Sequence, residues 1–195
     1  MVNSRELIIQ RFQESIAIKE KIIGNNNLIK MIADISEQLT NVIKAGNKLI
    51  LCGNGGSASD ALHFAGEIVG RFQMDRPAWA AIVLNADVAT MTAIANDYGY
   101  DEVFARQAEA HVRPGDLFIG ISTSGNSENI LRAAKVAKEK GAITAAFLGK
   151  DGGRIKDIVD YPIVVECNTT ARVQESHICI IHIICELIEK PLQNV

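Results

Sequence analysis

Apolar residues recur every three to four positions through the first 45 residues, a spacing typical of amphipathic helices. Gly24 and the asparagines at 25–27 interrupt this pattern, so two helices are predicted within residues 4–45. Gly46 follows the second pattern, where a glycine is typical of a helix end. We therefore expect a helical pair that packs on the rest of the chain or on a partner.

Short apolar runs alternate with longer amphipathic stretches from residue 48 onward. The short runs predict buried strands at 48–52, 78–85, 116–122, 142–149 and 161–167. The longer stretches predict helices at 57–72, 87–97, 102–112, 127–141 and 172–190. This alternation is typical of an α/β fold with a parallel sheet between helical layers. Because no linker-like segment interrupts it, residues 1–195 are expected to form one domain, with a helical pair (1–45) and an α/β core (46–195).

Composition narrows the class of protein without naming a function. The chain has 195 residues, of which 48% are hydrophobic and 22% charged, as is ordinary for a soluble globular protein. The net charge of −3 gives no electrostatic reason to expect nucleic acid as a partner. No apolar run reaches the roughly 18 residues of a membrane helix, and none at the start resembles a signal peptide. The four cysteines lack metal-site or disulfide spacing, which favours reduced thiols in the cytoplasm.

Two loops share one layout, a strand followed by a Gly/Ser/Asn turn and a helix start, at residues 48–59 and 116–129. Both turns are expected at the carboxyl edge of the sheet, where open α/β folds bind ligands. Glycines let the backbone approach an anion, and a helix N-terminus attracts one. The second loop adds four hydroxyls within six residues, those of Ser122, Thr123, Ser124 and Ser127. It is therefore a candidate phosphate site, although a plain capped turn would use similar residues.

A nucleotide is a weaker interpretation of the first loop. Gly53, Gly55 and Ala58 match the short dinucleotide pattern G-x-G-x-x-A. That pattern also requires an acidic residue about 20 positions later, at the end of the next strand. Here this distance falls before the next predicted strand begins, and no Walker A motif is present.

His63 and Glu67 lie four residues apart, on one face of the helix that follows the first loop. This spacing suits joint metal coordination, or a base with an orienting neighbour. A polar pair on the surface is the alternative.

The last predicted helix is strongly apolar but is interrupted by Gln174, His177 and His182. His182 stands among isoleucines and is predicted to be buried, and a core histidine bonded to a carbonyl remains an alternative to a functional one. Gln174 and His182 are about 12 Å apart along a helix and about 80° apart around it. If both serve one metal, either the helix start is irregular or another subunit supplies one of them. The apolar helix favours such an oligomer interface.

Several motifs, in order, resemble the phosphoheptose isomerases of the sugar isomerase (SIS) domain family. They are CGNGGSASDALHFAGEIVGRF, AIANDYGYDEVFARQ, GISTSGNS, GKDGG and ARVQESHICIIHIICELIE, within residues 46–190. The resemblance implies a flavodoxin-like three-layer α/β/α sandwich with a five-stranded parallel sheet, assembled as a homotetramer. It also implies isomerisation of D-sedoheptulose 7-phosphate to D-glycero-D-manno-heptose 7-phosphate, a step toward lipopolysaccharide or other surface glycans.

The resemblance further implies which residues form the site. One zinc per subunit would be held by His63, Glu67, Gln174 and His182. The substrate would contact Asn54, Gly55, Gly56, Glu67, Asn96, Asp97, Ser122, Thr123, Ser124, Ser127 and Gln174. Glu67 would be the base at C1 and His182 the partner acid/base, through an enediol(ate). A zinc-bound carboxylate is a weaker base, so Glu67 would change its coordination during turnover unless the metal is partly structural. Some members carry an acidic residue where this chain has Ala171.

Two other functions are compatible with such a fold. The DnaA initiator-associating proteins, which are non-enzymatic tetrameric scaffolds, are similar in TAIAND and ARVQE, but do not keep the full His/Glu/Gln/His set. A regulator that senses a sugar phosphate would carry an added DNA-binding domain, for which this chain has no room. The set of His63, Glu67, Gln174 and His182 therefore favours the enzyme.

Overall fold

Five apolar segments form one parallel sheet in the computed structural model, which describes residues 3–193. The strands are β1 (Leu49–Gly53), β2 (Ala81–Val83), β3 (Leu117–Ser122), β4 (Ile143–Gly149) and β5 (Tyr161–Val165). Their spatial order is β2-β1-β3-β4-β5, all parallel. The order reverses between β1 and β3, which is the point where doubly wound sheets bind ligands. The predicted parallel sheet is confirmed, and the two Gly/Ser loops leave neighbouring strands at its carboxyl edge.

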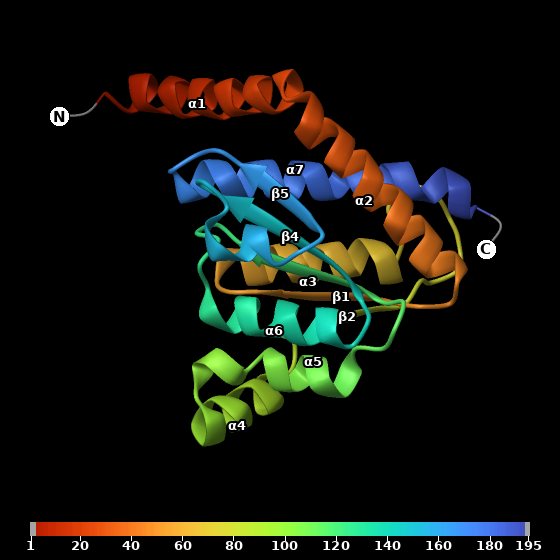
Figure 1. Ribbon diagram of the computed structural model, residues 1–195. Coiled ribbons are helices and arrows are strands. Elements are labelled where there is room, and N and C mark those ends of the chain that lie inside the picture. The colour runs from red at the N-terminus through yellow and green to blue at the C-terminus, as the bar shows by residue number, and fades with distance from the viewer. Residues whose placement is uncertain (1–2, 194–195) are drawn as a thin grey trace.

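Helices cover both faces of the sheet (Figure 1). One face carries α2 (Asn26–Lys44), α3 (Gly56–Val69) and α7 (Thr170–Glu189), and the other carries α4 (Val88–Tyr98), α5 (Ala105–His111) and α6 (Glu128–Glu139). Along β1, Leu49 and Leu51 pack toward the first layer, whereas Ile50 and Cys52 pack toward the second. A strand buried on both sides cannot alternate with polar residues, which explains its continuous apolar run.

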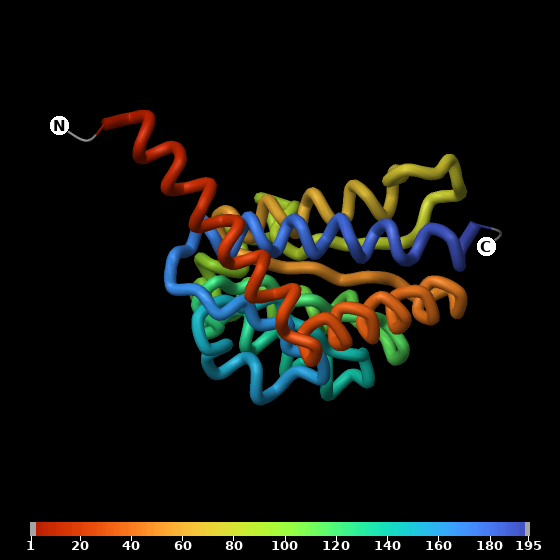
Figure 2. The backbone as a smooth tube through the Cα atoms, turned by 90° about the horizontal axis from the view of Figure 1, so that it is seen from above, coloured from red at the N-terminus to blue at the C-terminus, as the bar shows by residue number. Residues whose placement is uncertain are grey.

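The first helix, α1 (Ser4–Gly24), contacts α7, and its N-terminal part extends beyond the α/β core (Figures 1 and 2). It buries none of its residues within the described chain. Asn25 separates it from α2: its backbone N–H donates to Ile22 O, and its side chain accepts from the N–H of Leu28. The predicted break between two helices is thereby confirmed, and the asparagine supplies a cap to the second.

Three predicted elements differ from the observed ones. The strand predicted at 78–85 is reduced to β2, an edge strand that pairs only with β1. The helix predicted at 102–112 is divided into a 3-10 turn, η1 (Tyr100–Glu102), and α5. The helix predicted at 57–72 ends at Val69, because Gly70 caps it through a hydrogen bond from its N–H to Gly66 O. The remaining 3-10 turns are η2 (Gly153–Asp157) and η3 (Lys190–Leu192). Within residues 3–193, no helix is both long and apolar enough to cross a membrane.

Candidate active site

Two glycines shape the loop between β1 and α3 in different ways. Gly55 has φ +57°, a conformation that residues with a Cβ rarely adopt. Gly56 begins α3 directly against α7, where a Cβ would overlap the side-chain amide of Gln174. The loop therefore brings backbone, rather than side chains, to the N-terminus of α3.

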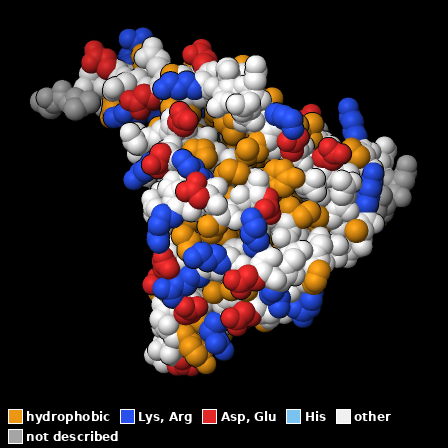
Figure 3. Space-filling view, viewed as in Figure 1, with side chains coloured by type: hydrophobic (Ala, Val, Ile, Leu, Met, Phe, Trp, Pro, Cys, Tyr) orange, Lys and Arg blue, Asp and Glu red, His pale blue; other side chains and the backbone are white. Residues whose placement is uncertain are grey.

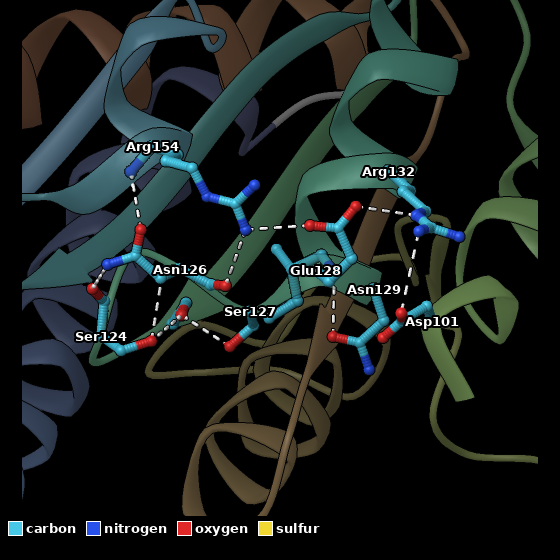
Figure 4. Close-up of polar contacts among 10 residues, drawn as sticks. Asp101, Ser124, Asn126, Ser127, Glu128, Asn129, Arg132 and Arg154 are labelled. Carbon is cyan, nitrogen blue, oxygen red and sulfur yellow. Dashed lines mark hydrogen bonds and ion pairs between the residues drawn. The ribbon is translucent and has the colours of Figure 1, made fainter. Parts of the chain in front are cut away.

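The loop between β3 and α6 is instead built around hydroxyl groups (Figure 4). Ser122 Oγ lies 2.9 Å from Ser127 Oγ and 3.4 Å from Ser124 Oγ. The N–H of Asn126 donates to Ser124 Oγ, and Gly125, at φ +65°, packs so closely on Gly152 that a Cβ would overlap it. Three of the four predicted hydroxyls thus form one cluster at the start of α6, which suits an anion.

Ion pairs hold this second loop from the outside (Figure 4). Glu128, in the first turn of α6, accepts from Arg132 Nε at 2.8 Å and from Arg154 at 2.9 Å. Arg132 also lies 3.7 Å from Asp101. Hydrogen bonds from Arg132 and Arg154 lower the pKa of Glu128. Each exposed pair contributes little alone, but together they connect α6 to two neighbouring segments.

Asn96 and Asp97 lie at the exposed end of α4, where Asn96 Nδ2 donates to Asp97 Oδ1 at 2.8 Å. The contact from this region to the loops comes from a residue that sequence reasoning missed. The hydroxyl of Tyr100 donates to Asn54 Oδ1 at 3.0 Å.

The structure brings three of the predicted metal ligands together between α3 and α7. His63 Nε2 lies 2.8 Å from His182 Nε2 and 3.3 Å from Glu67 Oε1. One ligand atom from each residue lies within 4.8 Å of the others. Two imidazole nitrogens and a carboxylate oxygen are the kinds of ligand that zinc takes in catalytic sites.

Gln174, the fourth predicted ligand, lies elsewhere along the same pair of helices. It sits beside Gly56 at the loop end, two turns before His182. Because α7 is continuous from Thr170 to Glu189, no irregular helix start brings Gln174 toward the two histidines.

The prediction that His182 is buried is wrong: its side chain is half-buried and stacks on Phe72, with ring centroids 5.7 Å apart. The core histidine is His177, which is 0% exposed and lies 3.1 Å from Leu148 O through Nε2. Burial lowers the pKa of His177 to about 4. The two histidines are five positions apart in the helix, a rotation of about 140°, so they face different neighbours.

A buried ion pair of Arg76 and Glu189, which the sequence did not predict, lies next to the cluster of His63, Glu67 and His182. Glu189, 3% exposed at the end of α7, accepts N–H groups from residues 72–74 and the Nε–H of Arg76. Arg76 also donates to the carbonyls of Glu67 and Ile68, at the end of α3. Burial lowers the pKa of Arg76, and Glu189 opposes that shift. The segment 72–76, which places Phe72 on His182, is therefore held by hydrogen bonds to α7 and to the end of α3.

The sequence model of the SIS domain matches residues 12–149. The chain belongs to the SIS domain family. Within that family it is similar to phosphoheptose isomerases over nearly its whole length. The phosphoheptose isomerase of Trichlorobacter lovleyi is 49% identical over 188 residues, which are 96% of this chain and 95% of that protein.

Solved structures agree with this membership. The phosphoheptose isomerase of Neisseria gonorrhoeae has a TM-score of 0.90 at 39% identity, covering 96% of this SIS domain chain and 100% of that one. The enzyme of Francisella tularensis has a TM-score of 0.92 at 34% identity, covering 97% and 100%. The expected three-layer sandwich is confirmed.

Proposed function

We propose that this SIS domain protein is an aldose–ketose isomerase that converts D-sedoheptulose 7-phosphate to D-glycero-D-manno-heptose 7-phosphate. The observation that carries the proposal is the cluster of His63, Glu67 and His182, in a chain about half identical to phosphoheptose isomerases. A non-enzymatic scaffold would not need this cluster.

The substrate is expected along the carboxyl edge of the sheet. The hydroxyl loop would take the phosphate, since its serines already converge at the N-terminus of α6. The remaining contacts would come from the first loop, the end of α4 and the helix pair, through Asn54, Gly55, Gly56, Glu67, Asn96, Asp97 and Gln174. Thr123 would complete the phosphate contacts.

Proton transfer is assigned to two residues of the cluster. Glu67 takes the proton from C1 of the ketose and returns it to C2, through an enediol(ate). His182 is the partner acid/base, and its ring orientation is supported by stacking on Phe72 and by an edge contact with His63.

One zinc per subunit would be held by His63, Glu67 and His182, and it would act as a Lewis acid on the sugar oxygens. Gln174 of the same chain lies at Gly56, so a neighbouring copy would have to supply this fourth ligand. The chemistry of the donor set supports the metal, and it also suits other divalent ions.

Self-association as a homotetramer is part of the proposal. A groove of about 310 Å³ between the two N-terminal helices and α7 is lined mainly by apolar side chains, among them Ile22, Ile32, Ile183 and Leu187. Hydrophobic side chains also gather in the upper middle of the face seen in Figure 3. Such surface favours a protein partner. Four free cysteines favour a cytoplasmic location, and the product would enter synthesis of lipopolysaccharide or another surface glycan.

The test is an isomerase assay with sedoheptulose 7-phosphate, before and after chelation. We expect conversion that falls on metal removal and returns with added zinc. No conversion in any condition would overturn the proposed isomerase activity and favour a non-enzymatic scaffold. Unchanged conversion after verified metal removal would overturn the zinc alone.

A further inference from the structure

Asn54, at the tip of the first loop, is locked in a reciprocal pair with Asn129 of α6. Asn129 Nδ2 donates to Asn54 Oδ1 at 3.0 Å, and Asn54 Nδ2 donates to Asn129 Oδ1 at 3.0 Å. Asn129 is 4% exposed, whereas Asn54 is half-buried at the edge of the loop. Figure 4 shows Asn129 in the first turn of α6, beside Glu128.

The orientation of both amides follows from one backbone group. The N–H of Ile130 donates to Asn129 Oδ1 at 2.9 Å, which directs Asn129 Nδ2 toward Asn54 Oδ1. Asn54 Oδ1 also accepts from the hydroxyl of Tyr100 at 3.0 Å. A carbonyl oxygen has two lone pairs, so this oxygen has no capacity left for a ligand.

The remaining group on Asn54 is the second hydrogen of its Nδ2. We propose that Asn129 is a positioning residue of the isomerase, which holds Asn54 as a hydrogen-bond donor toward an oxygen of the sugar phosphate. Tyr100 contributes by occupying the second lone pair of Asn54 Oδ1. This inference rests on the proposed function, and it assigns to the site two residues that contact Asn54 rather than the substrate.

The pair also links the two loops, which leave the neighbouring strands β1 and β3. Asn54 follows β1 and Asn129 follows β3, 75 residues later in the chain. Asn129 stands two residues beyond Ser127, which belongs to the hydroxyl cluster. The donor on Asn54 is therefore fixed relative to the candidate phosphate site. Loss of the pair would free the Asn54 side chain and the start of α6 from each other.

The test is a double-mutant cycle with Asn54→Ala, Asn129→Ala and the combined variant. A displaced contact can lower turnover by about 100-fold, so we expect kcat/KM to fall about 10- to 100-fold in each single variant. The combined variant should be no worse than the poorer single one, because Asn129 acts through Asn54. Asn129→Asp should match Asn129→Ala, since it keeps the bond from Ile130 but faces Asn54 Oδ1 with a second acceptor. Tyr100→Phe should show a smaller loss.

Gln107→Ala is the matched control, because Gln107 is a buried amide whose hydrogen bonds go to Val103 O and Met91 Sδ, and neither partner lies in the two loops. It should lower the unfolding temperature without changing kcat/KM. Multiplied losses in the combined variant, or an unchanged kcat/KM in folded Asn129→Asp, would overturn the positioning role. Calorimetric binding of sedoheptulose 7-phosphate separates the positioning role of Asn129 from the proposed isomerase activity. If the protein shows no turnover, an equal loss of affinity in the three variants of the cycle would still support the pair of Asn54 and Asn129. An unequal loss of affinity would reject it.

Discussion

His177 and His182 lie in the same apolar helix, five residues apart, yet the structure gives them opposite roles. His177 is enclosed by the sheet layer, contacts Phe147 and has one hydrogen bond, to Leu148 O. His182 faces α3, beside His63 and within reach of Glu67. An isoleucine-rich surrounding in the sequence therefore does not decide whether a histidine is buried.

The two sites differ in what they can do with a proton. Within the described residues, Nδ1 of His177 is buried without a hydrogen-bond partner, so Nε2 carries the hydrogen that Leu148 O accepts. A proton added to Nδ1 would place an uncompensated charge in the core. The surroundings of His182 contain a carboxylate and a second imidazole, which can share a cation or a proton.

The largest expected effect comes from changing Glu67. This carboxylate lies near His182, whereas no carboxylate is within the described contacts of His177. Glu67→Gln keeps the shape but removes the base, so turnover should fall about 10³-fold, within the range for general base catalysis. Steady-state kinetics with sedoheptulose 7-phosphate measures this. Size-exclusion chromatography should show an unchanged assembly, and turnover like that of the wild type would contradict the assignment of the base.

A paired experiment separates the two histidines directly. His182→Ala should reduce bound zinc and lower turnover about 10²-fold, because the proposed ligand and the proposed proton-transfer group are the same side chain. His177→Leu should retain zinc at the level of the wild type, since it alters a core position. Elemental analysis of both purified variants tests this, and equal metal loss in the two would erase the distinction.

The smallest expected effect is a dependence of stability on pH that His177 causes. Its pKa is about 4 in the folded protein, against 6.5 as the ordinary value, so the unfolded chain binds its proton more readily. The contribution to stability is complete above pH 6.5 and is lost as the pH falls toward 4. The slope is about 1.4 kcal/mol per pH unit.

Urea unfolding of the wild type and of His177→Leu between pH 7 and pH 4 isolates this slope, because other titrating groups contribute equally to both. The difference between the two free energies of unfolding should change by up to about 3 kcal/mol over that range. A constant difference would contradict the buried neutral imidazole.

Much of the fold follows from local patterns. The apolar runs predicted every strand of the sheet, and Gly24 with the asparagines marked the break between α1 and α2. Both Gly/Ser loops are predicted at one edge, because parallel strands place their carboxyl ends together. The pair of His63 and Glu67 was visible because residues four apart share a helix face.

Contacts between distant segments could not be obtained in the same way. The pairing of Asn54 with Asn129, and of Arg76 with Glu189, depends on which helices are neighbours. Gln174 was placed with the histidines by resemblance, and its position beside Gly56 emerges only from the packing of α7 on α3.

The alternation of strands and helices, the two polar loops and the residue types of the candidate site follow from the sequence alone, since periodicity and turn chemistry are local properties. Only the tertiary structure decided that His182 meets His63 while His177 enters the core. The physical reason is that a helix presents all of its faces in one sequence, and burial depends on the neighbours that each face acquires when the layers pack.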